Sequence, residues 1–136
     1  MLAGARAASA SRCEQRLRLP RSVRLRRRAE FQRVYEQGFR AGGRFIVVFV
    51  RQREGGVSSG VRFGVAASRR VGNAVVRNRC KRRLRELFRT DASVFEGCRV
   101  DVVINARHGC GDARWSELQR EYRRCVSKLM ERLASP

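Results

Sequence analysis

The sequence predicts a single α+β domain in which one central sheet is packed by helices, with the elements in the order αββαβα. A chain of 136 residues is the size of one domain. Segments with the apolar period of a helix alternate with short apolar or alternating runs that are typical of strands. The strand–helix–strand order over residues 61–106 also predicts two neighbouring parallel strands. We therefore expect an α+β sandwich.

Residues 1–20 come before the first predicted element and form a basic N-terminal extension, which we expect to be disordered. The extension is rich in Arg, Ala and Ser and has Glu14 as its only acid, so a transit peptide is the alternative. It lacks the apolar region of a secretory signal. The folded domain is then expected over residues 21–136.

The first helix is expected within residues 26–38, where the apolar residues recur at helical spacing and Gly38 ends the pattern. One side of this helix carries Phe31, Val34 and Tyr35.

Two strands are expected next. Residues 43–52 (GRFIVVFVRQ) form a continuous apolar, β-branched run, which predicts a buried strand. Residues 61–68 (VRFGVAAS) alternate between apolar and small or polar residues, as a strand does. Because a Gly/Ser-rich linker separates the two runs, we expect them to pair as a hairpin.

The second helix is expected after Asn73, a residue type that favours helix N-caps. Its apolar side is formed by Val76, Cys80, Leu84, Leu87 and Phe88. Its other side carries Lys81, Arg82, Arg85 and Arg89. A solvated helix normally interleaves acids and bases four residues apart, but Glu86 is the only acid between Arg69 and Arg89. The basic side therefore predicts contact with nucleic acid.

The C-terminal part is expected to hold a third strand over residues 99–106 and a long amphipathic helix from Trp115. The apolar stripe of that helix is Trp115, Leu118, Tyr122, Cys125, Leu129 and Leu133. His108 and Cys110 lie between the strand and the helix. They could hold a metal ion, but a glycine-rich surface loop is the simpler interpretation.

The net charge of +20, with a pI near 11.7, predicts a polyanionic partner. Nucleic acid is the first candidate and an anionic membrane surface the second. No apolar run approaches the ~20 residues of a membrane span. The five cysteines include no CxxC pair, which fits neither a disulfide framework nor a zinc ribbon and indicates a reducing compartment.

Residues 63–89 (FGVAASRRVGNAVVRNRCKRRLRELFR) resemble the strand, turn and RNR helix of the protein component of bacterial ribonuclease P. RRRAEFQRVYEQG at 26–38 is similar to the N-terminal helix of that family, and VDVVINAR at 100–107 to a later strand. The resemblance implies a ribosomal protein S5 domain 2-like fold with a left-handed βαβ crossover. General rules favour the right-handed form.

The resemblance also implies a function. In this family an RNA subunit is the catalyst, and it removes the 5′ leader of precursor tRNA endonucleolytically. The protein subunit binds that RNA and the leader, and it raises the affinity for substrate and for Mg²⁺ ions held mainly by the RNA. We therefore expect a cytoplasmic subunit with no catalytic side chain of its own. Its expected partners are the RNA subunit and precursor tRNA, with no membrane and no obligate protein partner.

Carried over by position, the resemblance implies two sets of site residues. The RNA-subunit-binding residues are Arg69, Arg70, Arg77, Asn78, Arg79, Arg82 and Arg85. The leader-binding residues are Phe31, Tyr35 and Phe49. Phe31 and Tyr35 lie one helical turn apart and could stack on unpaired bases, although packing in the core is the alternative. The chain departs from the family in its excess of Arg over Lys, and in RHGCG at 107–111, where the family has a Pro-containing turn.

Two rival functions fit the composition less well. A protein-only nuclease needs a carboxylate cluster for metal ions or an acid/base pair. The chain has one His, and Asp101 is the only acid in a predicted strand. A ribosomal or general RNA-binding protein could share this architecture, but the RNR-centred motif argues against it.

Overall fold

Four strands form the central sheet of the structure, a computed structural model that describes residues 24–53, 60–95 and 98–134. They are β1 (Phe39–Gly42), β2 (Ile46–Gln52), β3 (Arg62–Ala66) and β4 (Val100–Ala106), in the spatial order β1-β2-β4-β3. The helices are α2 (Arg28–Gln37), α3 (Ala74–Thr90) and α4 (Trp115–Ala134). Short 3₁₀ helices lie at Arg69–Val71 and Ala92–Phe95. The predicted α+β class is confirmed, while residues 1–20 lie outside the described part.

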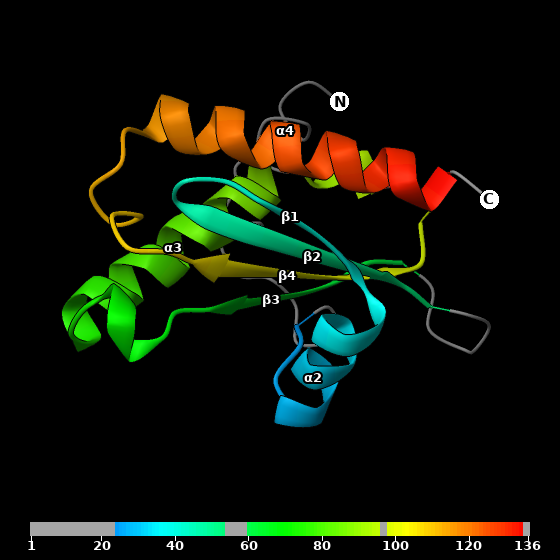
Figure 1. The fold of residues 1–136 in the computed structure, drawn as a ribbon, viewed down its shortest axis with the longest axis horizontal. Helices are drawn as coiled ribbons and strands as arrows, with labels where there is room; N and C mark the ends of the chain where they lie inside the picture. The colour runs from blue at the N-terminus through cyan, green and yellow to red at the C-terminus, as the bar shows by residue number, and fades with distance from the viewer. Residues whose placement is uncertain (1–23, 54–59, 96–97, 135–136) are drawn as a thin grey trace, which may run out of the picture.

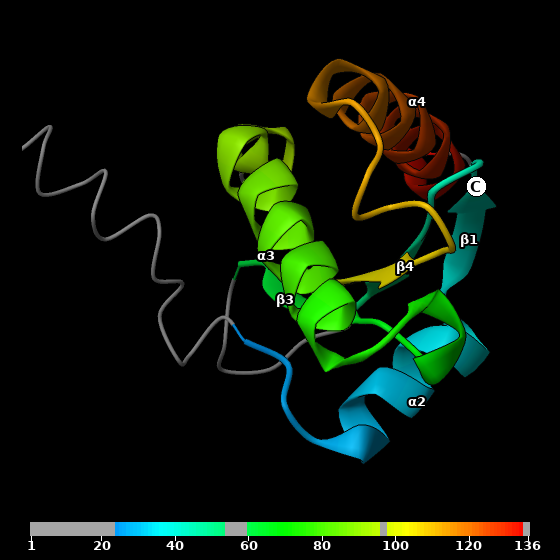
Figure 2. The ribbon, with the colours of Figure 1, turned by 90° about the vertical axis from the view of Figure 1, so that its left-hand side faces the viewer.

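The helices are divided unequally between the two faces of the sheet. Helices α3 and α4 cover one face, and α2 lies against the other (Figure 2). Strands β3 and β4 are parallel neighbours, as the sequence predicted, and α3 connects them. The path from β3 over α3 to β4 is left-handed (Figures 1 and 2), as the resemblance implied.

The predicted hairpin between the runs at 43–52 and 61–68 is wrong. Strand β4 lies between β2 and β3, and all seven residues of β2 pair with it antiparallel, from Ile46 opposite Ala106 to Gln52 opposite Val100. Strand β2 is buried on both faces along most of its length, so it needs a partner on each edge. The long apolar strand β4 provides one, and β1, a strand that the sequence analysis did not predict, provides the other.

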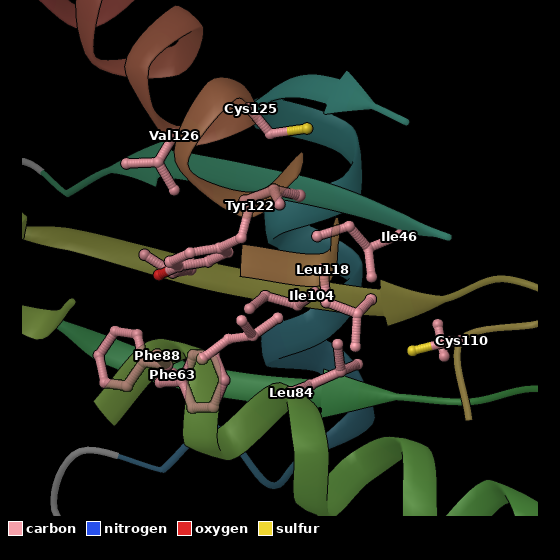
Figure 3. Packing of buried hydrophobic residues seen from close by; sticks show 14 of the residues in the cluster. Ile46, Phe63, Leu84, Phe88, Ile104, Cys110, Leu118, Tyr122, Cys125 and Val126 are labelled. Atoms are coloured by element: carbon pink, nitrogen blue, oxygen red, sulfur yellow. The ribbon is translucent and has the colours of Figure 1, made fainter. Parts of the chain in front are cut away.

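The main hydrophobic core fills the space between the sheet and helices α3 and α4 (Figure 3). The predicted apolar stripes of both helices point into it. The rings of Phe63 and Phe88 are stacked, with centroids 4.0 Å apart and planes at 9°. Leu84 and Leu118 are fully buried nearby. Each such side chain contributes roughly 1.5–3 kcal/mol through burial, so this face anchors α3 firmly on the sheet.

The opposite face of the sheet carries a much smaller cluster. Only Leu25, Val34 and Val103 are buried in it, and Phe31, Tyr35 and Phe49 are partly buried around them. Because side chains alternate along a strand, Val102 and Ile104 of β4 face the main core, and Asp101, Val103 and Asn105 face α2. No helix in the described part of the chain is long and apolar enough to cross a membrane.

Candidate RNA interface

The basic ridge comprises the outward residues of α3 and the turn before it. Its members are Arg69, Arg70, Arg77, Asn78, Arg79, Arg82 and Arg85. Helix α3 begins at Asn73, whose Oδ1 accepts a hydrogen bond of 3.0 Å from the Val76 N–H, so the predicted N-cap is confirmed. The buried stripe of α3 faces the sheet, and the ridge is therefore held facing outward.

The turn before α3 fixes where Arg69 and Arg70 lie. Val71 is buried and anchors this turn on the core, and both arginines are exposed. Gly72 then adopts φ 153°, and a Cβ at this position would lie 2.9 Å from Val76 Cβ. Only glycine fits there without strain. The turn places the two arginines beside the first turn of α3.

The protein itself neutralises little of the ridge's charge. Among the described residues, the ridge makes a single ion pair. It joins Arg79 Nη1 to Asp112 Oδ1 at 3.5 Å, and both side chains are exposed. Partial desolvation, together with the positive charges of Arg24 and Arg82, lowers the pKa of Arg85. The Nε of Arg77 is buried and has no hydrogen-bond partner in the described part of the chain. Such crowding of like charge favours a bound anion.

Two other arginines of α3 have structural partners. Arg83 donates hydrogen bonds to the carbonyls of Cys110 (2.7 Å) and Ala113 (2.5 Å) and so fastens the loop after β4 to α3. No local sequence pattern predicts this contact, because Arg83 and the loop are about 30 residues apart. Arg89, predicted on the free basic side, is only 18% exposed and is paired with Glu86. Its place on the basic side is not contradicted, but Glu86, one turn earlier on the same side of the helix, takes up part of its charge, so Arg89 is not counted in the ridge.

The aromatic cluster consists of Phe31 and Tyr35 from α2 and Phe49 from β2, and the structure brings all three together. The ring centroids of Phe31 and Tyr35 are 6.4 Å apart, and those of Tyr35 and Phe49 are 4.9 Å apart, both edge to face. All three side chains are partly buried, so each combines packing with an accessible surface. Phe31 and Tyr35 therefore pack on the sheet and still expose part of their surface, and base stacking on that surface stays a prediction.

Polar and small residues hold the aromatic cluster in position. The Tyr35 hydroxyl donates a 3.0 Å hydrogen bond to Asn105 Oδ1. Burial raises the pKa of Tyr35, so the hydroxyl stays protonated and continues to donate. A Cβ on Gly64 would lie 2.6 Å from Phe31 Cζ. Glycine at this position of β3 therefore allows the Phe31 ring to lie directly on the sheet.

An ion cluster around Asp101 lies on the same face of the sheet. Asp101 is 1% exposed and accepts two hydrogen bonds from Arg62, at 2.9 and 3.0 Å. Arg51 Nη1 lies 3.3 Å and Arg53 Nε 3.2 Å from its oxygens. Arg62 also reaches Glu30 of α2 at 2.8 Å. One buried carboxylate thus connects three strands, and through Arg62 it fixes the start of α2.

A second buried acid, Glu121 of α4, holds the turn between β1 and β2. Its carboxylate accepts hydrogen bonds from the backbone N–H groups of Arg44, Phe45 and Ile46, at 2.7, 2.8 and 2.9 Å. Glu121 is 7% exposed. The sequence analysis placed neither this contact nor the ion cluster, because both join residues far apart in the chain.

The loop after β4 is a turn-rich segment, as the simpler interpretation expected. His108 is exposed, Gly109 has φ 88°, and Cys110 is buried. The described residues contain no group of three or more His, Cys, Asp or Glu side chains that could hold a metal ion.

The sequence model of the Ribonuclease P family matches residues 19–130. The chain belongs to the ribonuclease P protein family. It is 42% identical over 117 residues to the ribonuclease P protein component of Kocuria rhizophila, covering 85% of this chain and 99% of the relative. It is 40% identical over 106 residues to that of Nocardioides sp., covering 78% and 90%.

Solved structures agree with this assignment. The ribonuclease P protein of Staphylococcus aureus matches with a TM-score of 0.67 and 28% identity, over 78% of this chain and 94% of that one. The protein from Thermotoga maritima matches with a TM-score of 0.63 at 24% identity, over 78% and 94%, which supports the fold. Family membership assigns this chain to ribonuclease P as its protein component, with a role in tRNA 5′ processing together with the RNA subunit.

Proposed function

We propose that the basic ridge binds the catalytic RNA subunit of ribonuclease P, and that the aromatic cluster binds the 5′ leader of precursor tRNA. The observation that carries this proposal is the ridge itself. Its arginines are anchored by a buried helix face, are exposed apart from the half-buried Arg77, and have almost no acidic partners among the described residues. In this proposal the RNA removes the leader, and the protein holds and orients both RNA molecules.

The ridge suits a folded RNA because its charges are fixed relative to one another. Guanidinium groups grip phosphate oxygens at two points. Several phosphates neutralised together release their counterions, which makes binding steeply dependent on salt. Asn78, exposed between Arg77 and Arg79, adds a side chain that can both donate and accept hydrogen bonds.

The aromatic cluster suits an unpaired strand. Bases stack on aromatic rings with roughly 1–3 kcal/mol each, and nearby cations follow the backbone. Arg40 supplies such a cation, because its guanidinium carbon lies 5.8 Å from the centre of the Phe49 ring. An edge-to-face arrangement of Tyr35 and Phe49 leaves ring surface available, since both side chains are only partly buried.

Mg²⁺ is the metal ion that the family's chemistry implies. The described side chains do not fit a resident Mg²⁺ site, because their carboxylates do not converge in a group of three. Asp101 and Glu30 are instead engaged by arginines. We propose that the RNA subunit holds most of the Mg²⁺, and we assign no step of the reaction to a protein-bound ion.

We also propose that this protein acts in the cytoplasm, without a membrane and without an obligate protein partner. Cys80, Cys98, Cys110 and Cys125 are free thiols, which is consistent with a reducing compartment. Its macromolecular partners would then be the RNA subunit and precursor tRNA.

Reconstitution tests the proposed function. We expect this chain, added to a bacterial ribonuclease P RNA at low Mg²⁺, to restore removal of the 5′ leader from precursor tRNA. The purified chain with Mg²⁺ but without the RNA should leave the substrate intact. Specific 5′ cleavage by the protein alone would overturn the assignment of catalysis to the RNA. If the chain raised the affinity of the reconstituted enzyme for precursor and mature tRNA equally, that result would instead indicate a general RNA-binding protein.

A paired substitution tests the basic ridge. Arg77→Ala with Arg79→Ala should weaken assembly with the RNA subunit and lower the slope of log affinity against log salt by about 1–2. The matched control is Arg120→Ala with Arg124→Ala, which removes two exposed arginines from α4. Binding titrations at several salt concentrations give both quantities. An unchanged slope for the ridge variant would contradict its role.

A further inference from the structure

Strand β1 forms a free edge of the sheet and places neighbouring residues on opposite faces. In the register with β2, Phe39 lies opposite Val50 and Arg40 opposite Phe49. Val50 faces the main core, and Phe49 belongs to the aromatic cluster. Arg40 therefore lies on the α2 side of the sheet, and Phe39 lies on the α4 side. A ligand that crosses this edge would meet Arg40 and then Phe39.

Phe39 has the surroundings of a base-stacking site. Its side chain is 36% exposed, one of three large hydrophobic residues exposed in the described part of the chain. The guanidinium carbon of Arg132, near the end of α4, lies over the Phe39 ring, 4.4 Å from its centre, so a base would stack on the other face of the ring or on the guanidinium plane. An exposed ring beside a cation is the combination that binds single-stranded nucleic acid without sequence preference.

The charge around this ring also favours RNA. Lys128 is exposed one helical turn before Arg132, on the same side of α4, and Glu131 is the one acid next to Arg132 in the described sequence of this helix. Glu36 is the nearest acid in sequence before β1, and it is hydrogen-bonded to Gln32 at 2.8 Å within α2. Helix α4 runs along β1 (Figure 1), so the Phe39–Arg132 pair lies just across the sheet edge from Arg40 and Phe49.

We propose that the upstream part of the precursor tRNA leader continues from the aromatic cluster around the edge of β1 and stacks on the Phe39–Arg132 pair. This inference rests on the proposed function and extends the leader site. The ligand is single-stranded RNA of any sequence, since stacking uses the base face rather than its hydrogen-bonding edge. Short leaders would reach only the aromatic cluster, and long leaders would reach both sites.

Leader length provides the test. The affinity of the reconstituted holoenzyme is measured for precursor tRNAs with leaders of about 5 and about 15 nucleotides. These lengths lie near the lower and upper ends of typical single-strand site sizes. Phe39→Ala should weaken binding of the long leader by about fivefold or more, the equivalent of losing ~1 kcal/mol from one stacked base. Binding of the short leader should not change. Phe39→Trp keeps a large ring, so it should retain the tighter binding of the long leader. Arg132→Gln removes the cation and should reduce that tighter binding.

Two further variants separate the possible outcomes. Val94→Ala shortens another exposed apolar residue (47% exposed), in the 3₁₀ helix after α3, and should change the affinity for neither leader. Tyr35→Ala should weaken binding of both. If Tyr35→Ala weakens binding but Phe39→Ala does not, or if Phe39→Ala acts equally on both leaders, only this extension is wrong, and Phe39 simply packs α4 against β1. If Tyr35→Ala also has no effect, the proposed leader site itself fails.

Discussion

The two faces of the sheet are built from the same strands but are covered very differently. On one face, α3 and α4 bury most of the inward-facing residues of β2, β3 and β4 in a continuous apolar core. On the other, α2 covers only a small cluster, and aromatic, charged and amide side chains remain partly accessible beside it. Successive residues of β4 show the contrast, since Val102 and Ile104 face the core and Asp101 and Asn105 face α2.

This difference indicates a division between stability and binding. The covered face supplies most of the burial, so it can hold α3 and its basic ridge rigidly. The open face has fewer apolar contacts. There the ion cluster around Asp101 supplies part of the interactions that connect the strands and α2. Substitutions should therefore separate: changes in the apolar core of the covered face should alter unfolding, and changes in the aromatic cluster of the open face should alter leader binding.

The largest effect is expected on the covered face. Leu84→Ala removes a fully buried side chain from α3 and should lower the free energy of unfolding by about 3–5 kcal/mol, through lost burial and the cavity left behind. Denaturant unfolding measures this. At a temperature where the variant is still folded, its preference for precursor over mature tRNA should be unchanged. A selective loss of leader binding would break the division between the two faces.

A smaller loss is expected from the ion cluster on the open face. Asp101→Asn keeps the size of the side chain but removes the charge that three arginines share. Breaking a buried pair costs about 3–5 kcal/mol, and since these arginines reach solvent we expect about 2–4 kcal/mol. Asp112→Asn, at an exposed ion pair, is the control and should cost less than ~1 kcal/mol. Equal losses would mean that burial of Asp101 is unimportant.

In the aromatic cluster, a substitution should affect leader binding more than the free energy of unfolding. Tyr35→Ala should weaken binding of long-leader precursor tRNA by roughly 1–3 kcal/mol through lost stacking, with little change for mature tRNA. Tyr35→Phe retains the ring and removes the hydrogen bond to Asn105, so it should retain most of the leader affinity. Equilibrium binding with both tRNA forms distinguishes the cases. The same loss for precursor and mature tRNA would indicate a packing role.

The sequence predicted the elements better than their arrangement. Helix α4 has the bounds expected from its apolar stripe, and α3 begins at the expected cap, because both signals are local. The pairing of β2 with β4 depends on residues that are far apart in the chain, from Gln52 with Val100 to Ile46 with Ala106, and no local pattern specifies it. Strand β1 was missed because FRAG is short, glycine-containing and mostly exposed. The handedness of the crossover came from the resemblance alone.

The same limit applies to the candidate site. The outward side of α3 and the pairing of Phe31 with Tyr35 follow from helical spacing, whereas Phe49 was placed only by the resemblance. Glu121 bonds to a turn some 75 residues away, and Asp101 to Arg51, 50 residues away. An acid within an apolar strand was a visible signal for the ion cluster, but its partners depend on the sheet order that the sequence left undetermined.

The smallest effect concerns Glu30, where the open face meets the start of α2. Burial alone would raise the pKa of Glu30, but the N–H groups of Arg27 and Arg26 and the charge of Arg62 outweigh it and hold the pKa below its ordinary 4.5. The stabilisation is therefore complete above that value and is lost as the pH falls through the lower pKa of the folded state. Glu30→Gln should remove this component, which is below ~1 kcal/mol because the side chain is partly exposed. Unfolding curves between about pH 3 and 7, with the exposed Glu36→Gln as control, measure it. A Glu30→Gln curve parallel to that of the unmodified protein would mean that the Arg62 bridge contributes nothing to docking α2.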